Sequence, residues 1–204
     1  MRSGFLRKLL PAALSALLTA CAVTEPAGTT SDKVVPAPTL GPGDQRIVVS
    51  VTEQKMVLFE RGRPFAVVPV STSKFGVGDV PGSKRTPLGR FEVAEIVGRG
   101  LPLGAKLKSR IPTGEVVPVN APGRDNIVTR VVRLRGMEPG NRNALDRCIY
   151  FHGTTNEASL KTPASYGCVR MRSWQIARMC NWAQVGARVD IVEGRLPAPG
   201  NLPP

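Results

Sequence analysis

The chain has 204 residues, a formal net charge of +13 and only 5% aromatic residues. Its basic residues are scattered without a run of five, and so few aromatic side chains offer little stacking surface, which argues against a nucleic-acid-binding protein. A single histidine and four cysteines without a CxxC spacing argue against a zinc site, and no metal is expected. The charge favours an anionic partner such as a cell-wall polymer.

The first 20 residues are predicted to be an export signal. A basic start precedes an apolar run over residues 9–18, which is too short to cross a bilayer. Small residues then lead directly into Cys21, an order similar to the lipobox of bacterial lipoproteins, in which the cysteine carries lipid. An ordinary secretory signal is the alternative. Both interpretations predict the periplasmic side of the cell envelope, and Ala22 favours an outer-membrane anchor.

Residues 21–44 are rich in proline, glycine, serine and threonine and lack periodic apolar residues, which predicts a flexible linker. The domain is expected to span residues 45–192, followed by a proline-rich tail over 193–204. Within the domain, three short segments rich in β-branched residues lie between 46 and 71. Turn-like residues separate them, so they predict an antiparallel meander.

Further strands are expected within residues 83–97, 126–136 and 147–153, where β-branched and apolar residues recur. In the segment NIVTRVVRLRG, residues 126–136, the positions that alternate with their neighbours are Val128, Arg130, Val132 and Leu134. Glycine and proline interrupt the stretch that ends at Ala121, for which no regular element is predicted.

A helix is expected to begin at Ser173, which can cap it, and to end near Gly186. Its buried face is expected to hold three small or aliphatic residues, Ile176, Cys180 and Ala183. Residues 187–194 predict a closing strand. The whole pattern indicates a mainly β fold with one or two short helices.

One histidine and one cysteine stand out as a candidate pair. His152 ends a predicted strand, and Cys168 follows 16 residues later, directly after Gly167. A thiol needs a base or a positive environment to become a nucleophile near neutral pH, and an imidazole can supply both. Glycine before the cysteine lets the backbone bend and aim its amides at an oxyanion. From spacing alone, a buried thiol with an unrelated histidine is favoured over a catalytic pair.

The segment IYFHGTTNEASLKTPASYGCVRM, residues 149–171, resembles the signature of the L,D-transpeptidase (YkuD) family. That signature has a histidine and a glycine after a strand, followed by S-x-G-C-h-R. The segments VPVSTSKFG (68–76) and RTPLGRFEV (85–93) are similar to the strand and turn that precede it in the family. The likeness covers about residues 45–192. One departure is Tyr166, because many members have a histidine there.

The resemblance implies a YkuD-like β-sandwich or mixed sheet with one or two short helices packed on it, and no cofactor. It implies that Cys168 is the nucleophile and His152 the general acid and base. The backbone carbonyl of Gly153 would hold the imidazole. Ser165 would lie in the cysteine loop, where the amides around Gly167 and Cys168 would form the oxyanion hole.

Other candidates keep two interpretations each. Arg170 would contact a substrate carboxylate or brace the loop, unless it is an ordinary surface arginine. Tyr150 would line the pocket or belong to the core, and Tyr166 would change the pocket contacts. Cys180 is expected to be a buried hydrophobe. Cys148 shares a predicted strand face with His152, and a disulfide between Cys148 and Cys180 stays open.

The resemblance implies an enzyme that acts on peptidoglycan stem peptides, with a membrane contact only through the N-terminal lipid. The Cys168 thiolate would attack the meso-diaminopimelate–D-alanine bond of a tetrapeptide stem and release D-alanine. The acyl group would pass to an amine, which gives a 3→3 crosslink or attaches a protein. Water as acceptor would make a carboxypeptidase or hydrolase. A non-catalytic wall-binding lipoprotein and a binder of nucleic acid or anionic membrane, suggested by charge alone, are the remaining alternatives.

Overall fold

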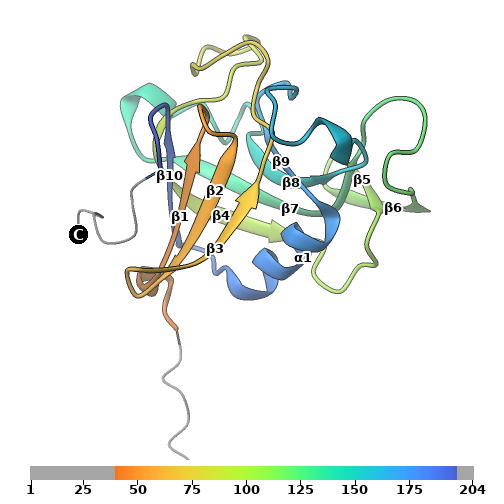
Figure 1. The fold of residues 1–204 in the computed structure, drawn as a ribbon, viewed down its shortest axis with the longest axis horizontal. Helices are drawn as coiled ribbons and strands as arrows, with labels where there is room; N and C mark the ends of the chain where they lie inside the picture. Colours follow the sequence, from red (N-terminus) through yellow and green to blue (C-terminus); the bar gives the residue numbers. More distant parts are fainter. Residues whose placement is uncertain (1–39, 197–204) are drawn as a thin grey trace, which may run out of the picture. The chain divides into compact units, whose positions relative to one another are not determined.

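A computed structural model describes residues 40–196 of the chain (Figure 1). The predicted export signal, the lipidation site Cys21, most of the predicted linker and the end of the predicted tail lie outside these residues. Within the part that the structure describes, no helix is long and apolar enough to cross a membrane.

The described chain folds into ten strands, one α-helix and three short 3-10 turns. The strands are β1 (Gln45–Ser50), β2 (Lys55–Glu60), β3 (Arg63–Pro69), β4 (Gly89–Val97), β5 (Ala105–Lys108), β6 (Ile111–Val116), β7 (Ile127–Gly136), β8 (Tyr150–Thr154), β9 (Val169–Met171) and β10 (Arg188–Val192). The helix is α1 (Ser173–Trp182), and the 3-10 turns are Pro42–Asp44, Pro139–Asn141 and Glu157–Ser159. The expectation of a mainly β fold with a short helix is confirmed.

The strands form one mixed sheet in the order β3-β2-β1-β10-β4-β7-β5-β6, from which β8 and β9 branch at β7. β1, β2 and β3 pair antiparallel, as the predicted meander requires. The closing strand β10 runs parallel to β1 and antiparallel to β4. Among the strands, β9 pairs only with β8, in parallel, and an isolated antiparallel bridge also joins Arg170 of β9 to Ser71.

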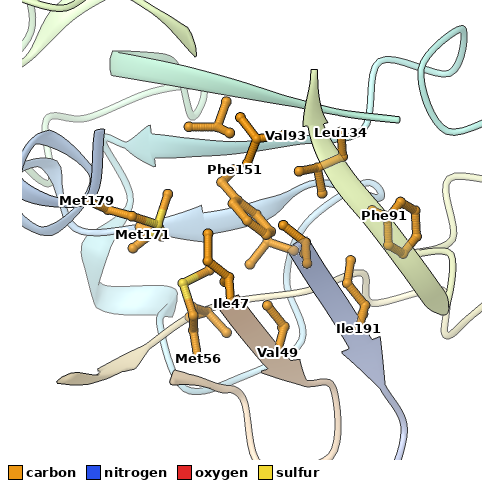
Figure 2. Close-up of a cluster of buried hydrophobic side chains, with 14 of the residues drawn as sticks. Ile47, Val49, Met56, Phe91, Val93, Leu134, Phe151, Met171, Met179 and Ile191 are labelled. Atoms are coloured by element: carbon orange, nitrogen blue, oxygen red, sulfur yellow. The ribbon is translucent and has the colours of Figure 1, made fainter. Parts of the chain in front are cut away.

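The main core lies between the sheet and α1. Figure 2 shows Phe151 of β8 surrounded by apolar side chains from β1, β4, β7 and β10. Ile176, Met179 and Cys180 of α1 belong to the same cluster. Burial of each large apolar side chain contributes about 1.5–3 kcal/mol, so this cluster dominates the stability of the domain.

The hairpin of β5 and β6 was not predicted from the sequence. Its strands are joined by the two residues Ser109 and Arg110, whose φ angles are 51° and 70°. Such a turn is favoured by asparagine and glycine, so serine and arginine give no recognisable hairpin signal. All six residues of β6 are exposed and one of them is Gly114, so the strand lacks the alternation of apolar and polar residues that would reveal it.

The helix begins at Ser173, as predicted, but its N-cap and its C-terminal end differ from the prediction. Its N-cap residue is Arg172, not Ser173, and the Ser173 N–H donates a hydrogen bond to Oε1 of Glu157 at 2.8 Å. A distant carboxylate therefore takes the role expected of the serine hydroxyl. The helix stops at Trp182, before Gly186. The predicted buried face is confirmed for Ile176, Cys180 and Ala183.

Candidate active site

The parallel strands β8 and β9 bring the candidate residues to one face of the sheet. His152 lies opposite Arg170 in the register, and Cys168 directly precedes β9. The neighbouring residues Phe151 and Val169 point into the main core. Because side chains alternate along a strand, His152 and Arg170 point to the other face.

That face holds a cavity of about 820 Å³. It brings together five residues predicted from the sequence: His152, Ser165, Tyr166, Cys168 and Arg170. Three cationic residues also line it: Lys74, Lys84 and Arg124. Among the described residues, no group of three or more histidine, cysteine, aspartate or glutamate side chains could hold a metal ion.

His152 is held as a neutral base. Its Nδ1 lies 2.9 Å from the Gly153 carbonyl oxygen, which can only accept, so Nδ1 carries the proton and Nε2 stays an acceptor. Only 4% of the residue is exposed. Burial lowers the pKa of His152, and the Gly153 carbonyl and Asp125 oppose this shift in part.

A bulge in β7 shapes the backbone beside this histidine. Val128 pairs with Gly153 and Val131 with His152, so β7 carries two additional residues at this point. One of them, Thr129, has φ of 71°. A Cβ on Gly153 would lie 2.5 Å from the Val128 carbonyl oxygen, so the close approach of β7 requires glycine here.

The Cys168 thiol is protonated in the resting site. Its Sγ donates a hydrogen bond to the Cys148 carbonyl oxygen at 3.3 Å. Burial raises the pKa of Cys168 to about 11, against the opposing effects of the Tyr150 backbone and Arg170. The site therefore rests as a neutral thiol with a neutral imidazole, not as a thiolate–imidazolium pair.

The loop 165–168, here called the cysteine loop, is fixed by one serine. Ser165 Oγ donates to the Cys168 carbonyl at 2.6 Å and accepts from the Gly167 N–H at 3.2 Å. Gly167 has φ of 120°, and a Cβ there would lie 3.3 Å from the Arg85 carbonyl oxygen. The Gly167 amide, expected in an oxyanion hole, is thus engaged by Ser165.

Arg170 is buried and braces the loop before β7. It forms an ion pair of 3.0 Å with Asp125. The other oxygen of Asp125 accepts hydrogen bonds from the hydroxyls of Thr154 and Thr155 and from the Asn156 N–H. Because Arg170 is only 7% exposed, it is not an ordinary surface arginine. Sequence reasoning missed Asp125, which follows a glycine- and proline-rich turn and belongs to no recognisable motif.

Tyr150 does not line the cavity. It is 5% exposed and forms a buried cluster with Leu107 and Val131. Cys168 packs against this cluster. Its hydroxyl accepts a hydrogen bond from Arg110 Nη1 at 3.0 Å. Tyr150 therefore belongs to the core, and the prediction that it lines the pocket is wrong.

The other two described cysteines lie in different surroundings. Cys148 is exposed, precedes β8 with φ of 58°, and touches the site through its carbonyl. Cys180 lies in the main core, where burial raises its pKa to about 12. Both are free thiols, so the described residues contain no Cys148–Cys180 disulfide.

A family model described as YkuD, the L,D-transpeptidase catalytic domain, matches residues 44–191. No curated protein is significantly similar to the chain. Similar solved structures include an L,D-transpeptidase from Mycobacterium smegmatis, with 17% identity, a TM-score of 0.46 and coverage of 73% of this chain and 58% of that one. One from Mycobacterium tuberculosis H37Rv has 15% identity, a TM-score of 0.47 and coverage of 74% and 58%.

A third, from Xylanimonas cellulosilytica DSM 15894, has 17% identity, a TM-score of 0.45 and coverage of 76% of this chain. The present chain spans 63% of the length of that structure. It therefore matches less than two thirds of each of these solved chains.

Proposed function

The chain belongs to the YkuD family of L,D-transpeptidase catalytic domains, and we propose that it is a peptidoglycan L,D-transpeptidase. Cys168 is the nucleophile in this proposal and His152 the general acid and base. The observation that carries it is the cavity that both residues line, in which His152 Nε2 is an acceptor while Nδ1 is held by Gly153.

Acylation begins from the neutral pair. The Cys168 thiol turns away from the Cys148 carbonyl and gives its proton to His152 Nε2 as Sγ attacks the carbonyl carbon of the meso-diaminopimelate–D-alanine bond. The C–N bond of the tetrahedral intermediate then breaks. His152 returns the proton to the leaving nitrogen, D-alanine departs, and a thioester on Cys168 remains.

Transfer reverses the same proton path. An acceptor amine gives a proton to His152 as it attacks the thioester, and the thiol of Cys168 is restored when the C–S bond breaks. An amine from another stem gives a 3→3 crosslink, and an amine from a protein gives attachment. Water in the same position gives an L,D-carboxypeptidase.

The oxyanion that forms in each step needs backbone donors. The Cys168 N–H belongs to the loop that carries the nucleophile and is the first donor in this proposal. The Gly167 N–H can join it only after Ser165 releases it, since the two are hydrogen-bonded at 3.2 Å.

We also propose that the domain works on the periplasmic side of the cell envelope, tethered by lipid on Cys21. The order of basic residues, apolar run and cysteine at the N-terminus supports this proposal. Removal of residues 1–20 takes away three positive charges, so the net charge falls from +13 to +10, which suits an anionic wall polymer as the working environment.

The test is incubation with disaccharide tetrapeptide fragments of peptidoglycan, followed by mass spectrometry. A dimer that has lost one D-alanine supports transpeptidation, and a tripeptide product alone supports carboxypeptidase action. Cys168→Ala is the matched control and should yield neither product. Intact substrate with the unmodified protein, together with retained binding to wall polymer, would favour the non-catalytic lipoprotein.

A further inference from the structure

Two lysines and two aromatic rings form a cluster at the mouth of the cavity, here called the lysine–aromatic rim: Lys74, Phe75, Lys84 and Tyr166. The rings of Phe75 and Tyr166 lie 5.6 Å apart between centroids. The Nζ atoms of Lys74 and Lys84 lie 4.8 Å and 5.5 Å from the centre of the Tyr166 ring. Lys74 Nζ also donates to the Tyr166 hydroxyl at 3.4 Å. Cation–π contacts thus hold two ammonium groups over one ring.

These ammonium groups have no anionic partner in the part of the chain that the structure describes. Lys74 and Lys84 both line the cavity, as does Arg124. The single acidic residue of the cavity lining, Asp125, is already paired with Arg170 at 3.0 Å. The cavity therefore presents uncompensated positive charge, which favours an anionic ligand.

The rim is tied to the cysteine loop by hydrogen bonds. Ser73 Oγ donates to the Lys84 carbonyl at 2.5 Å and accepts from the Phe75 N–H at 3.0 Å. The Lys74 N–H donates to the Ser165 carbonyl at 3.2 Å. The backbone of both lysines is therefore placed relative to the nucleophile before a ligand arrives, which reduces the ordering cost of binding.

We infer that Lys74 and Lys84 bind the diaminopimelate carboxylate of the donor peptide. The site then selects stem peptides in which this carboxylate is free over those in which it is amidated. The inference deepens the proposed function and rests on it. Lysine offers a compact charge with three donors, and the aromatic rings restrict where it can lie. The hydrogen bond from Lys74 and then the charge of that lysine lower the pKa of Tyr166. A histidine in place of Tyr166 would bring a third titratable cation beside the lysines.

A pair of small reagents tests the charge of the rim without any peptide. Iodoacetate and iodoacetamide alkylate the same thiol, but only iodoacetate is anionic. The ratio of their rates at Cys168, resolved from Cys148 by peptide mass, should fall about fivefold in a Lys74→Met/Lys84→Met variant. Lys55→Met, an exposed lysine at the start of β2, is the charge-matched control and should leave the ratio unchanged. Salt should reduce the wild-type ratio.

A second measurement tests selectivity on the donor itself. Tetrapeptide fragments with free and with amidated diaminopimelate carboxylates are compared by their kcat/KM. The double lysine variant should lose about tenfold in kcat/KM for the free carboxylate, chiefly through KM, and keep its value for the amidated donor.

The two measurements separate the inference from the proposed function. If the wild type turns over neither donor, the proposed transpeptidase activity is refuted. If the ratio of iodoacetate to iodoacetamide rates at Cys168 still depends on the two lysines in that case, the rim binds anions all the same. If both proteins turn over the donors and the ratio of kcat/KM for the free donor to kcat/KM for the amidated donor is the same in the wild type and the double variant, the inference alone is overturned. A rate ratio that is unaffected by the two lysines would overturn it as well.

Discussion

At His152, burial and hydrogen bonding act together to keep an acceptor in the cavity that Cys168 also lines. Burial lowers the pKa of the imidazole, and the Gly153 carbonyl fixes its proton on Nδ1 at 2.9 Å. The opposite shift at Cys168, whose pKa is raised to about 11, keeps that thiol protonated at neutral pH. In the proposed mechanism the pair therefore has to move a proton during the attack, which would make the histidine a base and not only an electrostatic partner.

Replacement of this base should cost most of the activity. We expect His152→Gln, which stays neutral and can still donate to Gly153, to lower kcat for D-alanine release by about 10²–10⁴-fold with little change in KM. Mass spectrometry of the released D-alanine measures this, and circular dichroism checks the fold. A glutamine variant within a few-fold of wild-type kcat would mean that another group removes the thiol proton.

The candidate site illustrates which residues a sequence reveals. His152, Gly153, Gly167 and Cys168 stand within a recognisable motif, so the motif alone suffices to propose their places. Asp125 could not be proposed in this way, because it comes from a turn about 27 residues before the histidine and is brought in by folding. The rim lysines were equally hidden, since nothing in a chain with 28 lysines and arginines marks two of them.

Among the strands, β7 contains a bulge that shapes the site. The two additional residues between Val128 and Val131 bring the Val128 carbonyl close to Gly153 at the end of β8. Period-two alternation predicted the strand, but a bulge depends on pairing with a neighbour and leaves no local pattern. The β5–β6 hairpin was missed because its Ser109–Arg110 turn and the exposed strand β6 give no local signal, whereas the β1–β3 meander, rich in β-branched residues, was predicted.

The bulge makes Gly153 intolerant of a side chain. We expect Gly153→Ala to lower the free energy of unfolding by about 1–3 kcal/mol, because its Cβ would lie 2.5 Å from the Val128 carbonyl oxygen. Urea denaturation measures the change. Gly140→Ala is the matched control, since nothing lies within 4 Å of a Cβ at that position. Equal stabilities of the two variants would show that β7 moves aside at no cost.

For the whole molecule, the buried titratable groups set a pH window of stability. The pKa of His152 is lowered from 6.5, so below that pH the unfolded chain takes up a proton that the folded site resists, and stability falls. The pKa values of Cys168 and Cys180 are raised from 9.0 to about 11 and about 12. Above pH 9 the unfolded thiols lose protons that the folded ones keep, so stability falls again.

The alkaline side gives the clearer measurement. Each of these thiols should contribute a loss of about 1.4 kcal/mol per pH unit above pH 9, and Cys180→Ala should remove the contribution of one of them. Urea denaturation under reducing conditions between pH 8 and 10 gives both slopes. Lysines and tyrosines titrate alike in the two proteins, so only the difference in slope counts. Identical slopes would show that Cys180 titrates normally in the folded protein.

The single histidine also provides a spectroscopic handle. Because His152 is the only imidazole in 204 residues, one Cε1–H cross-peak in a carbon–proton NMR spectrum reports on the site without mutagenic assignment. Its chemical shift during a pH titration gives the protonation state of the base directly. The same peak can follow thioester formation in real time, as a label that the protein carries naturally.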